Sequence, residues 1–231
     1  MTPARKPKGR TLAEFEPLQP AEKKLLDACW QGEVAHIADS RPEAAHENNT
    51  VRAGFLRFLA LGGDEQAPVH ERGVRLRGAW ITDTLNLASA SVPSDLSMLH
   101  CQFSEMPLFT GTDIAGSLDF TGSRLPGFAG QGMTVSGHLI CNDTTFDGKE
   151  DYALFADNAV IKGAIFLKNA RTTGTVRLLG AQISSNLECD NATFDGKEGY
   201  ALFADHTVIK GAAFLKNAHT TGTVRLPGAQ I

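Results

Sequence analysis

The chain has 231 residues, of which 42% are hydrophobic and 21% are charged, and its formal net charge is -4. This composition is typical of a soluble globular protein and excludes a largely disordered one. The weak negative charge argues against direct binding to nucleic acid, which normally needs a basic face.

The sequence contains no recognisable membrane or secretion signal. No apolar run reaches the roughly 18 residues of a transmembrane helix, and the basic start of the chain is not followed by the apolar segment of a secretory signal. The four cysteines, Cys29, Cys101, Cys141 and Cys189, form no CxxC pair. We therefore predict a cytoplasmic protein without a transmembrane segment, whose thiols stay free.

The first two segments are predicted from their composition and apolar spacing. Residues 1–19 begin with Pro, Gly and basic side chains, which predicts a disordered basic tail. Residues 20–72 are predicted to form a small helical cap, because apolar residues recur at helical spacing after Pro20. A bundle this small buries little surface by itself, so we expect it to cover the open end of the next domain.

Three helices are expected within this cap. The first begins at the proline, and a short second helix spans residues 33–38. Asn49 or Thr50 is expected to cap the third helix. We interpret Arg52 and Arg57 on that helix as part of its solvated face.

The strongest signal in the chain is a tandem repeat. Residues 139–183 and 187–231 align at an offset of 48 residues, and 35 of their 45 aligned positions are identical. Apolar side chains there, and from residue 74 onwards, come in pairs two residues apart, and the pattern repeats every 11 residues. The 48-residue repeat is thus four 11-residue units plus a 4-residue insertion. The pairs are Val74/Leu76, Ala79/Ile81, Leu85/Leu87, Ala90/Val92, Leu96/Met98, Cys101/Phe103, Leu118/Phe120, Leu139/Cys141, Leu154/Ala156, Ile165/Leu167, Val176/Leu178, Leu187/Cys189, Leu202/Ala204, Ala213/Leu215 and Val224/Leu226.

This pattern predicts a coiled chain of short strands. Apolar residues two apart lie on one side of a strand, and coiling lets each short strand pair with the strands one coil above and below. Two 11-residue units make a 22-residue coil with four short faces. We predict a mainly β protein in which residues 73–231 form a four-sided parallel β-helix of about seven coils. A three-sided coil is the structural alternative.

Runs such as GVRLRGAWI, GTVRLLGAQI and SSNLECDNATF resemble the degenerate repeats of bacterial pentapeptide-repeat proteins. The resemblance covers roughly residues 20–231. It implies a right-handed, four-sided parallel β-helix, or solenoid, with apolar or small residues pointing inward from each face. The start of the chain also looks like the leader of a bacterial subgroup that sometimes carries the label of a membrane-associated oxidoreductase.

No pattern in the residues indicates catalysis or a bound cofactor. There is no GxGxxG between a strand and a helix, and the seven histidines show no HxH or HExxH spacing. Cys101, Cys141 and Cys189 are expected to point inward, where thiols are inert. We predict that the protein is not an enzyme and has no catalytic, cofactor-binding or metal-ligating residues.

The two inserted loops are the best candidates for a functional surface. They interrupt the coil at the same place in both copies, so they should project from one side about two coils, roughly 10 Å, apart. Each contains a tyrosine, which is favoured at contact surfaces; the alternative is a tolerated insertion whose tyrosine packs on the wall. The candidate residues are Asp147, Lys149, Glu150, Tyr152, Asp195, Lys197, Glu198 and Tyr200.

The last coil is a candidate assembly edge. Val224, Leu226 and Ile231 are predicted at inward positions with no capping helix after them, and open strand edges invite pairing with another chain. We expect either a homo-oligomer formed through this coil or a longer solenoid of which this chain is a part.

The favoured function is a non-enzymatic scaffold that binds a protein partner through its flat faces and the two loops. A second hypothesis is a modulator of a topoisomerase-type DNA-handling enzyme that acts through a duplex-like shape. A third is the membrane-associated redox protein that the subgroup label implies. The sequence does not identify the partner.

Overall fold

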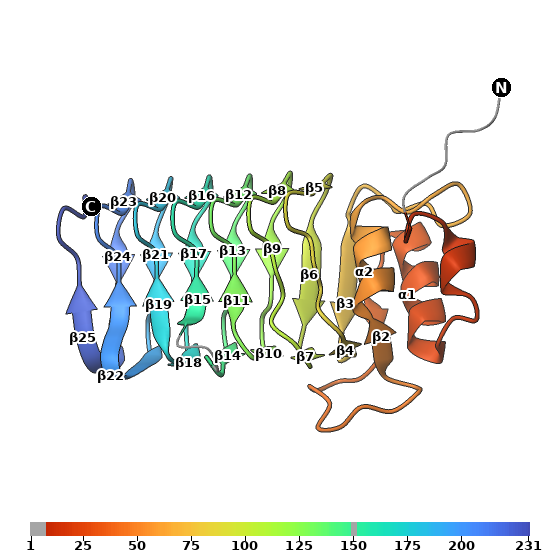
Figure 1. Ribbon diagram of the computed structural model, residues 1–231, viewed down its shortest axis with the longest axis horizontal. Helices are drawn as coiled ribbons and strands as arrows, with labels where there is room; N and C mark the ends of the chain where they lie inside the picture. Colours follow the sequence, from red (N-terminus) through yellow and green to blue (C-terminus); the bar gives the residue numbers. More distant parts are fainter. Residues whose placement is uncertain (1–7, 149–151) are drawn as a thin grey trace.

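The computed structural model describes residues 8–148 and 152–231 and has the shape of a rod (Figure 1). Parallel strands form the walls along most of its length, and two short α-helices lie at the N-terminal end. In one wall, seven strands from β3 to β24 follow one another in hydrogen-bonded order, one from each coil. The predicted mainly β solenoid of about seven coils is confirmed.

Each coil passes four walls in a fixed order, so its cross-section has four sides. Wall 1 contains β1 (Ala35–His36), β3 (Val74–Arg77), β6 (Leu96–Leu99), β9 (Leu118–Asp119), β13 (Leu139–Ile140), β17 (Ile165–Phe166), β21 (Leu187–Glu188) and β24 (Ala213–Phe214). Wall 2 contains β2 (Thr50–Arg52), β4 (Trp80–Thr82), β7 (Gln102–Phe103), β10 (Arg124–Leu125), β14 (Thr145–Phe146) and β18 (Arg171–Thr173).

Wall 3 contains β11 (Phe128–Ala129), β15 (Tyr152–Phe155) and β19 (Thr175–Arg177). Wall 4 contains β5 (Ser91–Val92), β8 (Asp113–Ile114), β12 (Thr134–Val135), β16 (Val160–Ile161), β20 (Gln182–Ile183) and β23 (Val208–Ile209). Two longer strands, β22 (Thr193–Phe203) and β25 (His219–Arg225), run through wall 2 into wall 3. They join these two walls into a single sheet.

The register between coils confirms the predicted repeat length. Paired residues in wall 1 are 22, 21, 26, 22 and 26 positions apart in successive coils, which matches a 22-residue coil with two 4-residue insertions and one deletion. The pairs are Leu96–Leu118, Leu118–Leu139, Leu139–Ile165, Ile165–Leu187 and Leu187–Ala213.

The inward side chains form one continuous core along the rod. The first member of each apolar pair stacks on its equivalent one coil away, and nearly all of these residues are buried before the last coil. Four phenylalanines fill the centre, where the coil is one residue shorter, and their ring centroids lie 5.3 to 6.1 Å apart. They are Phe103, Phe109, Phe120 and Phe128.

The N-terminal segment is more structured than its composition predicts. Residues 8–19 include the 3-10 helix η1 (Leu12–Phe15), and the side chains of Phe15 and Leu18 are buried. The predicted disordered tail therefore does not extend over these residues, because two apolar side chains anchor them. Residues 1–7 lie outside the described part of the chain.

Two of the three expected helices differ from the prediction. The helix α1 (Pro20–Gln31) begins at the expected proline. Residues 33–38 contain the strand β1 in place of a short helix, because their backbone pairs with β3. The helix α2 (Ala53–Ala60) begins later than expected, because residues 50–52 form β2 and pair with β4. Walls 1 and 2 thus start within the predicted cap.

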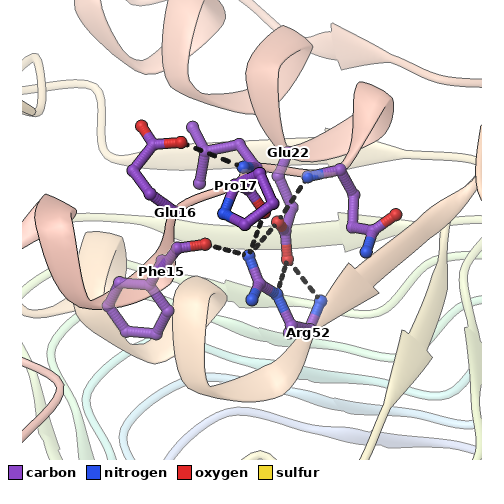
Figure 2. Close-up of polar contacts among 7 residues, drawn as sticks. Phe15, Glu16, Pro17, Glu22 and Arg52 are labelled. Atoms are coloured by element: carbon purple, nitrogen blue, oxygen red, sulfur yellow. Dashed lines mark hydrogen bonds and ion pairs between the residues drawn. The ribbon is translucent and has the colours of Figure 1, made fainter.

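A buried ion pair joins the helices to the first coil (Figure 2). The Glu22 side chain is fully buried, and its carboxylate accepts hydrogen bonds from the Nε atom of Arg52 at 2.8 Å and from its Nη2 atom at 2.6 Å. The same Nη2 atom donates to the carbonyl oxygen of Phe15 at 2.5 Å. Glu22 raises the pKa of Arg52 through these hydrogen bonds. Arg52 is therefore a structural contact between η1, α1 and β2 rather than a solvated side chain.

Candidate binding groove between the inserted loops

A groove on wall 3 lies between Tyr152 of the first insertion and Tyr200 of the second. Tyr152 pairs with Thr175 one coil away, and Tyr200 lies one coil further along the rod, in β22. The coil between them, which contains β18 and β19, has no insertion, and Gly174, Thr175 and Arg177 of this coil form the floor of the groove. The resulting cavity has a volume of about 650 Å³. The residues that line it are Tyr152, Gly174, Thr175, Arg177, Gly196, Lys197, Gly199, Tyr200 and Phe203.

Rings and guanidinium groups alternate along the outer side of wall 3. Phe155, Arg177, Phe203 and Arg225 occupy paired positions on four successive strands. The Cζ atom of Arg177 lies 5.4 Å from the ring centroid of Phe155 and 4.9 Å from that of Phe203. Cation–π contacts of this length are attractive and are stronger when the cation is partly desolvated. The aromatic rings therefore hold the guanidinium in place at the groove.

A buried carboxylate fixes the same guanidinium from one side. The Nε atom of Arg177 donates to Oδ2 of Asp157 at 2.7 Å, and the exposed fractions of the two side chains are 25% and 10%. The other carboxylate oxygen of Asp157 accepts the backbone N–H of Leu179 at 3.1 Å. In the second copy Arg225 binds Asp205 at 2.8 Å in the same way. Asp205 raises the pKa of Arg225, with a smaller contribution from Tyr200.

Both tyrosines pack on the wall and still reach solvent. The ring of Tyr152 stacks on Phe155 at 4.8 Å, and the ring of Tyr200 meets Phe203 edge-on at 5.1 Å. Their exposed fractions are 37% and 38%. Packing on the wall and accessibility to a partner are thus compatible, because each tyrosine contacts a phenylalanine and remains partly exposed.

The charged residues predicted in the loops have different environments. Asp147 accepts hydrogen bonds from Nε and Nη2 of Arg124 at 2.8 and 3.0 Å, so it is already engaged. Oδ1 of Asp195 accepts the backbone N–H of Lys197 at 3.0 Å, and the exposed Lys197 lines the groove. Lys149 and Glu150 lie outside the described residues, as does the side chain of Glu198.

Sequence reasoning missed the polar and aromatic residues beneath the tyrosines. The coil alone does not require them, because none of them belongs to the apolar core. Their identity in both copies of the repeat was the available signal, since outward positions are free to differ. They are Phe155 and Phe203, Asp157 and Asp205, and Arg177 and Arg225.

The cysteines lie away from this groove. All four are buried and unpaired, and burial raises the pKa of Cys29, Cys101 and Cys189 to about 12. Burial also raises the pKa of Cys141. Within residues 8–148 and 152–231, no cluster of three or more His, Cys, Asp or Glu side chains could hold a metal ion.

The predicted assembly edge is exposed. The exposed fractions of Val224, Leu226 and Ile231 are 44%, 45% and 69%, and Phe214 and Leu215 beside them are similarly exposed. Pairing of this edge with a second copy stays a prediction, which sedimentation of wild type against Leu226→Lys can test.

These features define the class of the protein as a parallel β-solenoid with a helical N-terminal end and one groove built by its tandem repeat. Comparisons with models of protein families, with curated proteins and with solved structures give no match. In the described ranges, the helices are all too short or too polar to cross a bilayer.

Proposed function

We propose that this protein is a non-enzymatic scaffold that binds a protein partner at the groove between Tyr152 and Tyr200, with the flat walls extending the contact. The observation that carries the proposal is that two partly exposed tyrosines and Arg177 line one cavity on a rod of otherwise short, regular coils. The four-sided coil is also what the resemblance to pentapeptide-repeat proteins implies, and membership of that family is part of this proposal.

The composition of the groove favours protein contacts. Tyrosine and arginine are enriched among the residues that contribute most to protein–protein affinity. Both tyrosine rings rest on phenylalanines, and the arginine is held by Asp157. These side chains are already ordered in the free protein. They would therefore lose little conformational entropy when a partner binds.

Shortening the two insertions tests the proposal without disturbing the coil. The coil of β18 and β19 shows that 22 residues close a turn with Gly174 between the two strands, where φ is +103°. A glycine adopts this conformation without strain. Deleting residues 149–152 and 197–200 leaves Gly148 and Gly196 at the equivalent places. We expect this variant to keep its circular dichroism spectrum and to lose a partner that immobilised wild type captures from its host.

A matched control replaces exposed lysines on another wall. Lys162 and Lys210 are equivalent positions of the repeat next to β16 and β23 on wall 4. The variant Lys162→Ala/Lys210→Ala should retain the partner. Retention by the shortened variant, or loss by the lysine control alone, would place the contact outside the groove and contradict the proposal.

A further inference from the structure

We propose that the groove recognises an acidic segment of the partner, with a carboxylate bound between Arg177 and Lys197. This inference rests on the proposed function and specifies the chemistry of the partner. It commits to an acidic polypeptide because the polar groups and the aromatic surfaces of the groove are those that carboxylate-bearing side chains complement.

Two cations at the groove support an anionic occupant. Arg177 and Lys197 both line it. Asp157 binds Arg177 through the Nε atom, and within the described residues no group accepts a hydrogen bond from either Nη atom. The outer edge of the guanidinium is therefore available, although the group is already held by its neighbours.

The geometry around Arg177 favours a carboxylate over a hydrophobic group. The centroids of Phe203, Phe155 and Tyr152 lie 4.9, 5.4 and 5.9 Å from its Cζ atom. These rings restrict other groups from stacking on the guanidinium. A ligand therefore meets the N–H donors that lie in the plane of the guanidinium. A planar guanidinium binds carboxylates through two parallel hydrogen bonds, and such charge-assisted pairs are stronger than neutral ones.

The floor of the groove leaves room for a polypeptide backbone. Gly174 and Thr175 belong to the floor, and Gly196 and Gly199 line the groove from β22, so few side chains rise between the two tyrosines. Tyr152 and Tyr200 then provide apolar surfaces and hydroxyl groups on opposite sides of the cavity. An extended acidic segment fits this arrangement.

The test measures binding of a fluorescein-labelled oligoglutamate peptide to the full chain by fluorescence anisotropy. Oligoglutamine of equal length is the uncharged control. We expect saturable binding of oligoglutamate that weakens as salt is raised, because exposed charges are screened over about 10 Å at 0.1 M salt. Absence of saturable binding, or equal binding of oligoglutamine, would overturn the inference.

The tandem repeat supplies a matched pair of variants. Arg177→Gln and Arg225→Gln each remove a guanidinium from a buried aspartate and from Phe203, but only Arg177 lines the groove. Arg177→Gln should weaken oligoglutamate binding by about tenfold or more, as loss of a hydrogen bond to a charged group predicts. Arg225→Gln should leave it within about twofold. Equal losses in both variants would overturn the inference.

Lys197→Gln keeps the test decisive if both arginine variants unfold, because this exposed side chain has no ion pair within the described residues. It should weaken binding several-fold while thermal unfolding stays unchanged, and unchanged binding would count against the inference. Tighter binding of a single-stranded oligonucleotide than of oligoglutamate would assign the groove to nucleic acid and overturn it. If oligoglutamate does not bind while capture of the host partner still depends on the two loops, the inference of an acidic partner segment is wrong and the proposed function stands.

Discussion

Two equivalent aspartates in the tandem repeat differ in one hydrogen bond. Oδ1 of Asp157 accepts the backbone N–H of Leu179 at 3.1 Å. Asp205 is 5% exposed, and its Oδ1 atom has no partner within the described residues. The residue equivalent to Leu179 is Pro227, which has no backbone N–H to donate. One substitution between the copies therefore leaves a buried carboxylate oxygen unsatisfied.

This difference predicts opposite effects of two exchanges. Pro227→Leu should raise the free energy of unfolding by about 1 kcal/mol, because a hydrogen bond to a charged group outweighs the lost rigidity of proline. Leu179→Pro should lower it by about 2 kcal/mol or more, because it removes the same bond from Asp157. Urea unfolding followed by circular dichroism measures both. Destabilisation by Pro227→Leu would show that Asp205 is satisfied in another way.

Thiol reactivity is a second test at the scale of single residues. All four cysteines are buried, and their raised pKa values keep them protonated and unreactive near pH 8. We expect Ellman's reagent to modify none of them in the folded protein and all four in denaturant. Rapid modification of Cys101 or Cys189 in the native protein would mean that the inner columns open readily.

At the scale of elements, the Glu22–Arg52 pair joins η1, α1 and β2. Arg52→Met leaves a fully buried carboxylate with only backbone donors, so we expect a loss of about 3–5 kcal/mol in the free energy of unfolding. The free energy of unfolding should fall less in the double variant Glu22→Gln/Arg52→Met than in the single variant, because a neutral amide needs no counter-charge. Thermal unfolding measured at 222 nm reports the helices.

The exposed Arg72 provides the control for this pair, since Arg72→Met removes a charge of the same sign near the same end of the rod. Its unfolding temperature should match that of wild type. If Arg52→Met also left the unfolding temperature unchanged, Glu22 would have to be solvated. The ion pair would then not hold the N-terminal elements together.

At the scale of the whole molecule, the central phenylalanines should determine the stability of the middle coils. Phe120 is fully buried and contacts Phe128 in its own coil and Phe103 and Phe109 in the preceding coil. Phe120→Ala should lower the free energy of unfolding by about 3–5 kcal/mol, as expected for deletion of a buried ring. In a solenoid each coil contacts only its neighbours, so the effect should be local.

Hydrogen exchange can locate this effect along the rod. We expect Phe120→Ala to reduce the protection of amides in β7 to β13 while β20 and β21 keep theirs. Phe214→Ala, at a side chain that is 44% exposed, is the matched control and should change protection little in the middle coils. Uniform loss of protection after Phe120→Ala would instead mean that the solenoid unfolds as one unit.

Most of the coil was predictable because its determinants are close in sequence. Each apolar pair spans three residues, and the 22-residue period follows from successive pairs, so strand positions and insertions could be counted along the chain. The two loops that carry the tyrosines were also predicted to project from one side, because they interrupt the 11-residue pattern at the same place in both copies of the repeat. Residues 33–38 and 50–52 were assigned to helices instead, because their strand conformation depends on pairing with β3 and β4.

Sequence by itself therefore determined the solenoid, its period and the two insertions, since each follows from a local pattern repeated many times. Only the tertiary structure decided that the coil between the insertions forms the floor of a groove. It also decided that Arg177 lies there, with Phe155 and Phe203 on neighbouring strands and Asp157 at its Nε atom. These contacts join residues about 20 to 26 positions apart, and their geometry depends on how successive coils stack.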